Sequence, residues 1–141
     1  MVDPTLLVRT VLTNAQLNEL FAAAWADHVA TDFGPVHRRS LTWISAWREQ
    51  RLVGYVNVAS DGGVHAFLLD TTVHPDEQRR GLGRRLVRTA AVEAARAGAT
   101  WLHVDFESRL DAFYRRCGSS MTAAGLVRRR GRRRRRGGTT G

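Results

Sequence analysis

The stretch from Leu41 to Val73 constrains the fold most strongly, because it is a succession of strand-like segments with very short connections. Its apolar positions are rich in β-branched and aromatic side chains, which favour strands. Asp61-Gly62-Gly63 supplies one tight turn and residues 48–51 supply the other. The three expected strands are "LTWISAW", "LVGYVNVAS" and "VHAFLLDTTV". Strands joined by such short turns pair in antiparallel fashion, so the sequence predicts a β-meander as the framework of the chain.

The residues before the meander predict one short strand and one helix. Leu6 to Arg9 is compatible with a strand, and Thr13 followed by Gln16 has the spacing of a capping box for a helix that runs through Trp25. Residues 26–40 have no sustained periodicity and contain a Gly-Pro pair. This segment is therefore expected to be a loop with room for a short helix.

After the meander the pattern becomes helical. Pro75 ends the third strand, and residues 80–97 place their apolar side chains on one stripe, which predicts an amphipathic helix that Gly98 ends. Beyond this helix we expect, in order, a strand at 100–106, a short helix at 108–117 and a final strand at 120–127. A chain of 141 residues with a hydrophobic content of 43% is long enough for one domain with a packed core.

Two glycines flanked by arginines begin the predicted helix, in the stretch "QRRGLGRRL" from Gln78 to Leu86. The first turn of a helix has backbone N–H groups without helical partners and a partial positive charge, and both favour a phosphate. Gly81 and Gly83 have no side chain that would keep a ligand away from these amides. The stretch therefore predicts a diphosphate site, although an ordinary helix start can have the same composition. Neither a nucleotide-hydrolysing P-loop nor a dinucleotide fingerprint matches these residues.

Three motifs, in this order along the chain, resemble the GNAT family of acyl-CoA-dependent N-acetyltransferases. Val73-His74-Pro75 matches the end of the family's fourth strand, and Gln78-x-x-Gly81-x-Gly83 matches its Q/R-x-x-G-x-G/A motif. Tyr114 stands four residues before Gly118, as in the family's Tyr-x-x-x-Gly helix. The resemblance extends from about residue 41 to residue 127.

The resemblance implies an α/β (α+β) fold of the GNAT type. Its central sheet would be mixed and mostly antiparallel, splayed between the fourth and fifth strands, and flanked by helices. Acetyl-CoA, the co-substrate, would bind in this split. The resemblance places its pantetheine arm beside Thr71, Thr72 and Val73, and its diphosphate on Gln78, Arg79, Arg80, Gly81, Leu82, Gly83 and Arg84.

Acetyl transfer to an amine needs a proton acceptor, because an alkylammonium with a pKa near 10.4 is only about one part in a thousand neutral at pH 7. Strand alternation puts Asp105 and Glu107 on one polar face, which either lines the acceptor site or is solvated. Asp70 and His65, on the preceding strand, are the other candidates for the base. Tyr114 matches the family's tyrosine that protonates the departing thiolate.

No metal site is expected, because His65 and His103 have no further ligands at a suitable spacing. Cys117 is the only cysteine, so the chain cannot form an internal disulfide, and no base that would activate a nucleophilic thiol is identifiable. Three further residues are candidates for the acceptor site, with a solvated loop or a core position as the alternative: Arg38, Arg39 and Trp43.

The net charge of +9 is concentrated at one end of the chain. Residues 128–141 hold eight of the 22 basic side chains and no acidic one, whereas residues 1–127 carry 14 basic and 13 acidic side chains. We expect residues 1–127 to form the acetyltransferase domain and residues 128–141 to be a disordered, arginine-rich tail. Such a tail binds RNA and other polyanions in a salt-dependent way.

The expected partners are acetyl-CoA and an amine of a small molecule or a protein, and homodimerisation stays open. The longest apolar run, Leu20–Ala26, is too short to cross a bilayer, and no secretory signal is visible, so a cytoplasmic protein is expected. The alternative function is a non-catalytic module of the same fold that senses acyl-CoA or associates with RNA or ribosomes.

Overall fold

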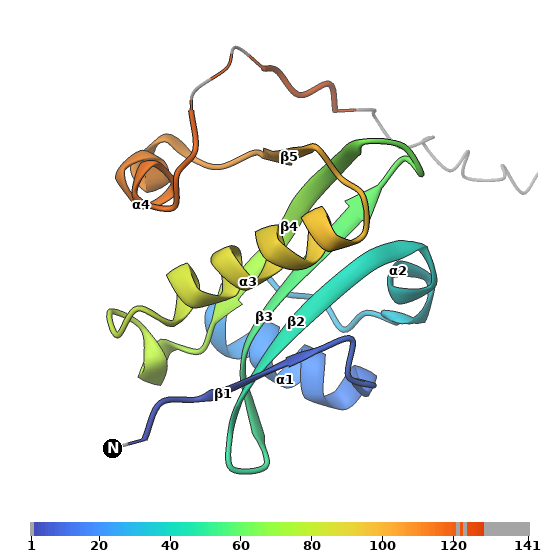
Figure 1. Ribbon diagram of the computed structural model, residues 1–141. Helices are drawn as coiled ribbons and strands as arrows, with labels where there is room; N and C mark the ends of the chain where they lie inside the picture. The colour runs from blue at the N-terminus through green and yellow to red at the C-terminus, as the bar shows by residue number, and fades with distance from the viewer. Residues whose placement is uncertain (1, 121, 123, 129–141) are drawn as a thin grey trace, which may run out of the picture.

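Five strands form one mixed sheet in the order β1-β2-β3-β4-β5 (Figure 1). The computed structural model describes residues 2–120, 122 and 124–128. The strands β1 to β4 pair in antiparallel fashion, and β4 pairs with β5 in parallel. The predicted meander and the predicted mixed sheet are therefore confirmed. The bounds are Thr5–Val8 for β1, Ser40–Arg48 for β2, Arg51–Ser60 for β3, His65–Val73 for β4 and Trp101–Val104 for β5.

Helices cover both faces of this sheet (Figure 1). The helices α3 and α4 pack on one face and α1 and α2 on the other, each pair over its own hydrophobic core. The helix bounds are Asn14–Ala24 for α1, Gly34–Arg39 for α2, Leu82–Arg96 for α3 and Asp111–Arg116 for α4. The described residues also include the 3₁₀ turns η1 at Pro75–Glu77 and η2 at Ser108–Leu110.

The larger core lies under α3. The predicted apolar stripe of this helix is buried against the strand side chains of the same face, among which are Ile44, Val56 and Leu68. Leu86, in the middle of the stripe, has no exposed surface. Burying a leucine side chain contributes about 1.5–3 kcal/mol, so this stripe fixes α3 firmly across the meander.

The smaller core lies under α1 and α2. Thr13 and Gln16 form the predicted capping box, in which the hydroxyl of Thr13 accepts from the Gln16 amide at 3.1 Å and the Gln16 side chain accepts from the Thr13 amide at 2.9 Å. The apolar face of α1 then packs on Trp43 and Tyr55 of the sheet. Trp43 is a core residue, and its indole N–H donates to the Thr10 carbonyl at 2.9 Å.

The strands β4 and β5 part after a short contact. Their pairing runs from His65 opposite Trp101 to Leu68 opposite Val104, while β4 continues to Val73. Within the described residues, no strand pairs with this edge of β4 beyond Leu68. The splay that the family resemblance implies is thus present.

A β-bulge interrupts β4 where the split begins. Asn57 lies opposite Leu69 and Tyr55 lies opposite Thr72, so β4 advances three residues while β3 advances two. The extra residue comes with Asp70, whose φ of 57° is in the left-handed region. Bulges bend a strand and re-aim its side chains, and this one does so at the point where β4 leaves β5.

The prediction of a final strand at 120–127 is wrong for the described residues of that segment, which are all outside strands. Gly118 turns the chain at the end of α4 with a φ of 94°, and the Ser119 amide donates to the Tyr114 carbonyl at 3.1 Å. The side chains of Leu126 and Val127 are 84% and 93% exposed. The segment buries too little apolar surface there to hold an extended conformation against the sheet. Residues 121 and 123, and residues 129–141 of the predicted tail, lie outside the described part of the chain.

Within the described residues, none of the helices combines the length and the apolar character that a bilayer crossing requires.

Candidate functional site

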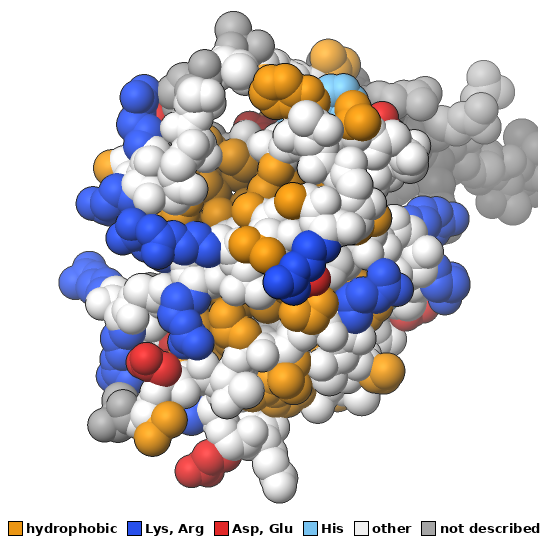
Figure 2. All heavy atoms as spheres, viewed as in Figure 1, with side chains coloured by type: hydrophobic (Ala, Val, Ile, Leu, Met, Phe, Trp, Pro, Cys, Tyr) orange, Lys and Arg blue, Asp and Glu red, His pale blue; other side chains and the backbone are white. Residues whose placement is uncertain are grey.

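The turn that begins α3 has the backbone that the glycine motif predicted. Gly81 is the N-cap of α3 with a φ of 82°, and a Cβ placed there would meet no atom within 4 Å. The first helical hydrogen bond runs from the Arg85 amide to the Gly81 carbonyl at 3.1 Å. The amides of residues 82–84 precede this bond and therefore have no partner within the helix. Basic side chains gather on the side of the molecule where α3 begins and α4 lies (Figure 2).

The predicted cofactor residues around this turn differ in what their side chains do. The Gln78 side chain donates to the Val73 carbonyl at 3.4 Å and so ties the turn to the end of β4. Leu82 is 2% exposed and points into the core, so only its backbone is available to a ligand. Gly83 faces Phe113 of α4, since a Cβ would lie 3.4 Å from that ring. A side chain of one carbon would thus make ordinary contact with α4 at this position.

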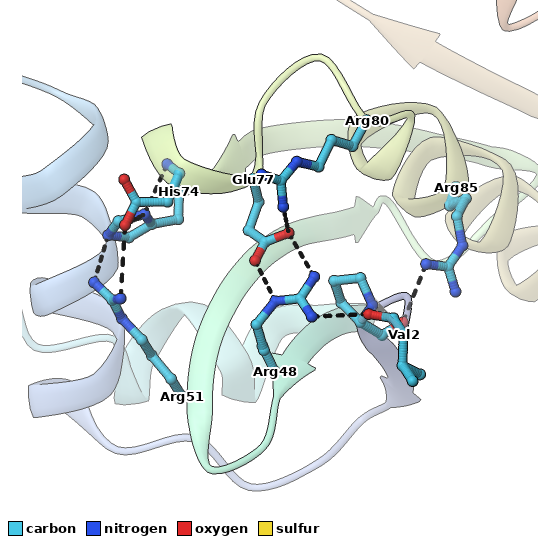
Figure 3. Close-up of polar contacts among 9 residues, drawn as sticks. Val2, Arg48, Arg51, His74, Glu77, Arg80 and Arg85 are labelled. Carbon is cyan, nitrogen blue, oxygen red and sulfur yellow. Dashed lines mark hydrogen bonds and ion pairs between the residues drawn. The ribbon is translucent and has the colours of Figure 1, made fainter.

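A buried carboxylate just before the turn was missed by the sequence reasoning (Figure 3). Glu77 is 4% exposed and forms an ion pair with Arg48 of β2. Nη2 of Arg48 also donates to Oε2 of Glu77 at 3.0 Å. Arg80 is the third member, with its Nη1 3.7 Å from the Glu77 carboxylate. The hydrogen bond from Arg48 lowers the pKa of Glu77, so the carboxylate stays charged at neutral pH. Arg80 is thus held toward Glu77.

Arginines near the turn also contact the first residues of the chain and, in a separate pair, the end of β4 (Figure 3). Arg48 donates to the Val2 carbonyl at 2.8 Å, and Arg85 of α3 donates to the Pro4 carbonyl at 3.0 Å. Arg51 lies 2.7 Å from the ring of His74 and lines, with it, a hollow of about 390 Å³ on the β3 side of β4. These contacts are non-local, and no local sequence pattern signals them.

Tyr114 lies across the split from β4. Its ring is 6% exposed and stacks on Phe106 with the ring centres 4.5 Å apart. Burial raises the pKa of the Tyr114 phenol, and a hydrogen bond from Thr71 partly opposes this shift. The phenol is therefore protonated at neutral pH. Thr71 and Tyr114, which the resemblance assigned to cofactor and catalysis, are thus brought together.

The other two predicted residues on β4 point away from each other. Thr72 is buried opposite Tyr55, and its hydroxyl donates to the Asp70 carbonyl at 2.8 Å. Val73 packs against the core under α3. A ligand in the split would therefore contact the backbone of these two residues rather than their side chains.

Asp70 is the predicted acid with the most unusual environment. Its side chain reaches the surface, yet the surrounding protein removes enough water to raise the pKa of its carboxyl. The negative charge of Asp70 also contributes to raising the pKa of Tyr55, after the larger effect of burial. The Tyr55 hydroxyl lies 2.8 Å from Nε2 of His37, and burial lowers the pKa of that histidine. Tyr55 and His37 therefore form a polar pair between β3 and α2, and the charge of Asp70 acts on this pair.

Asp105 and Glu107 lie beyond β5, which ends at Val104 and not at residue 106 as expected, although exposure still alternates there about the core under α3. Leu102, Val104 and Phe106 pack against that core, whereas the two acids are exposed. The carboxylate of Glu107 lies 2.6 Å from Arg109 in an exposed ion pair.

The structure also positions the residues that were considered for metal or thiol chemistry. His65 and His103 lie side by side, with Nδ1 of the first 2.8 Å from Nε2 of the second. Among the described residues, no group of three or more His, Cys, Asp or Glu side chains could hold a metal ion. Cys117 is half-buried, and burial raises the pKa of its thiol, which disfavours the nucleophilic thiolate. Arg38 and Arg39 are exposed on α2.

Comparisons with known proteins agree with this arrangement. Residues 12–119 match the model of the acetyltransferase (GNAT) family. Mycothiol acetyltransferase of Mycolicibacterium smegmatis is 32% identical over 106 residues, which cover 67% of this chain and 35% of that protein. Its counterpart in Gordonia bronchialis is 39% identical over 81 residues, or 55% of this chain and 23% of that protein. The chain thus spans about a third or less of the length of these relatives.

Solved structures resemble the fold over nearly the whole chain. A GNAT family acetyltransferase of Streptococcus pneumoniae superposes with a TM-score of 0.75 at 21% identity, covering 90% of this chain and 99% of that one. Glucosamine-6-phosphate N-acetyltransferase of Arabidopsis thaliana gives a TM-score of 0.69 at 12% identity, covering 89% and 98%. At these identities the solved structures show only that the fold is the same. The family model, in contrast, matches most of the chain. On this combined basis, the chain belongs to the GNAT family of acetyltransferases.

Proposed function

We propose that this chain transfers an acetyl group from acetyl-CoA directly to a primary amine. The observation that carries the proposal is the position of the protonated Tyr114 phenol beside Thr71, at the split where β4 leaves β5. A proton donor at the edge of an unpaired strand is what a departing thiolate needs when its arm lies along that strand. Membership in the family supports the same reaction.

The residues fit acetyl-CoA in two places. The amides of residues 82–84, with Arg79 and Arg84 nearby in sequence, suit the diphosphate, and each charge-assisted hydrogen bond contributes about 1.5–3 kcal/mol. The backbone of Thr71–Val73 lies on an edge of β4 that no strand among the described residues occupies, so it can pair with the amide groups of the pantetheine arm. Arg80, which is 3.7 Å from the Glu77 carboxylate, keeps its cation beside the same turn.

Asp70 is the best candidate for the base. Burial raises the pKa of the Asp70 carboxyl and so brings it closer to the pKa of an ammonium group. A smaller difference between the two pKa values favours proton transfer. Acetyl-CoA supplies the acetyl group as a thioester. The ammonium gives one proton to Asp70, and the neutral nitrogen bonds to the carbonyl carbon as the carbon–sulfur bond breaks. Tyr114 gives its proton to the sulfur and regains one from the nitrogen as the amide forms.

The diphosphate site is tested by a pair of glycine variants. Gly81→Glu places a carboxylate where the diphosphate is expected, whereas Gly62→Glu makes the same change at another glycine of positive φ, in the turn before β4. Both variants incur the same backbone strain, so only the loss of a ligand site differs between them. Isothermal titration should show acetyl-CoA affinity at least about tenfold weaker in Gly81→Glu and unchanged in Gly62→Glu.

Normal acetyl-CoA binding by Gly81→Glu would contradict the proposed site. The reaction itself is measured as release of free CoA thiol in the presence of a panel of amines. A protein that binds acetyl-CoA tightly but releases no thiol with any amine or peptide would instead be the non-catalytic acyl-CoA sensor.

A further inference from the structure

We infer that the amine acceptor carries an apolar, preferably aromatic, group that lies on the exposed face of β4 and β5. This inference rests on the proposed function and names the substrate class of the same site. It starts from four exposed side chains, which we call the β4–β5 strip: Phe67, Leu69, Trp101 and His103.

The strip is apolar and open to solvent. Phe67, Leu69 and Trp101 are 39%, 42% and 61% exposed. His103 joins them, because its ring stacks on Phe67 with the ring centres 4.8 Å apart and an interplanar angle of 18°. Exposed apolar side chains that adjoin one another favour a binding site.

The four side chains lie on one face of the sheet. On β3, Ala59 lies opposite Phe67 and Asn57 lies opposite Leu69. On β5, His103 lies opposite Phe67. Opposite partners in a sheet point to the same side, and alternate residues of a strand share a face. The strip is therefore on the side of α1 and α2, and its exposure means that neither helix covers it.

Carboxylates stand at one end of the strip. The strands β4 and β5 are parallel and part at their C-terminal ends. Asp70 follows Leu69 and Asp105 follows Val104, so both acids lie at this end of the strip. Tyr114 and Thr71 lie at the same end of the strip, on the opposite face of the sheet. A ligand with a cationic amine at one end and an apolar body complements this layout, with its amine at the split and its body on the strip.

The spacing along β4 limits the length of the acceptor. Residues in a strand are about 3.3 Å apart, so Phe67 lies about 10 Å before Asp70, with Leu69 between them. An aromatic ring two or three carbons from a primary amine, whose nitrogen lies about 2.9 Å from the Asp70 carboxylate, reaches Leu69 and the near edge of Phe67 within this interval. Fully polar amines of similar size leave the strip in water and gain nothing from it.

Two amines of similar basicity test the inference, 2-phenylethylamine and ethanolamine. Thiol release should give a kcat/KM about tenfold or more higher for 2-phenylethylamine, the range that apolar contacts supply. Leu69→Ser should raise the KM for 2-phenylethylamine about fivefold or more and leave the values for ethanolamine and acetyl-CoA unchanged. Phe67→Ser should act in the same direction. Val92→Ser, at a 50% exposed valine on α3, is the matched control and should change neither amine.

The outcomes separate this inference from the proposed function. Thiol release with equal efficiency for both amines, or a Leu69→Ser variant that matches Val92→Ser, overturns the inference and leaves the acetyltransferase in place. If no amine releases thiol, titration of CoA-bound protein with 2-phenylethylamine decides the matter, and absence of binding overturns the inference as well. Sedimentation showing a dimer that Phe67→Ser dissociates would assign the strip to a second copy of the chain and also overturn it.

Discussion

At the scale of single residues, Tyr114 is the side chain on which turnover should depend most. Its phenol is buried and protonated beside Thr71, so it can donate a proton but contributes little to holding the cofactor. Tyr114→Phe keeps the ring that stacks on Phe106 and removes only the hydroxyl. We expect kcat to fall about 10²-fold, as is usual for loss of a general acid, with the acetyl-CoA dissociation constant unchanged. Equal turnover in the variant would remove the tyrosine from the reaction.

Glu77 gives the protein a specific dependence on acid. Its pKa is lowered in the folded state by Arg48, so its contribution to stability is complete above the unfolded pKa of about 4.3 and is lost as pH falls through the lower folded value. Glu77→Gln should lower the free energy of unfolding at pH 7 by about 1–3 kcal/mol and flatten its decline below about pH 4.3. Denaturant unfolding at several pH values measures both effects.

The control for this variant is Glu93→Gln, which breaks the more exposed pair with Arg96 at 2.8 Å. Exposed pairs contribute little, so its free energy of unfolding should change by less than about 1 kcal/mol. If the two variants behave alike, the Glu77 network has no special part in the fold.

At the scale of elements, α1 depends on its capping box. Thr13→Ala removes the hydroxyl that accepts from the Gln16 amide, which should cost about 1 kcal/mol in the free energy of unfolding. Thr100→Ala is a suitable control, because Thr100 is exposed and its hydrogen bond to the Val64 carbonyl uses the backbone amide. Thermal unfolding should rank the cap variant clearly below the control, and equal midpoints would show that α1 is held by packing alone.

The sequence predicted the elements well where their signals were local. Alternation and tight turns placed the meander, and the spacing of Thr13 and Gln16 placed the start of α1. The bulge at Asp70 could not be predicted, since "LLDTTV" contains no glycine to accommodate a positive φ. The expectation of a strand at 120–127 was wrong for the described residues of that segment, because extended structure needs a pairing partner, which a local pattern does not supply.

At the scale of the whole molecule, the candidate site depends on contacts that join distant parts of the chain. The glycine turn was predictable from its own residues, but its anchoring through Glu77 and Arg48 joins positions 29 residues apart. The contact of Thr71 with Tyr114 likewise connects β4 with α4. Motif resemblance could name the tyrosine, whereas its raised pKa and its neighbours required the folded arrangement.

The short contact between β4 and β5 has a consequence for local unfolding of the molecule. Four residue pairs attach β5 to the rest of the sheet, while β2 and β3 share a pairing along nearly their full length. Opening the short contact therefore requires less free energy than unfolding the meander, so amide protons of β5 should exchange with solvent through an excursion that leaves β1 to β4 intact. A molecule lodged between β4 and α4 would slow that exchange by joining the two parts.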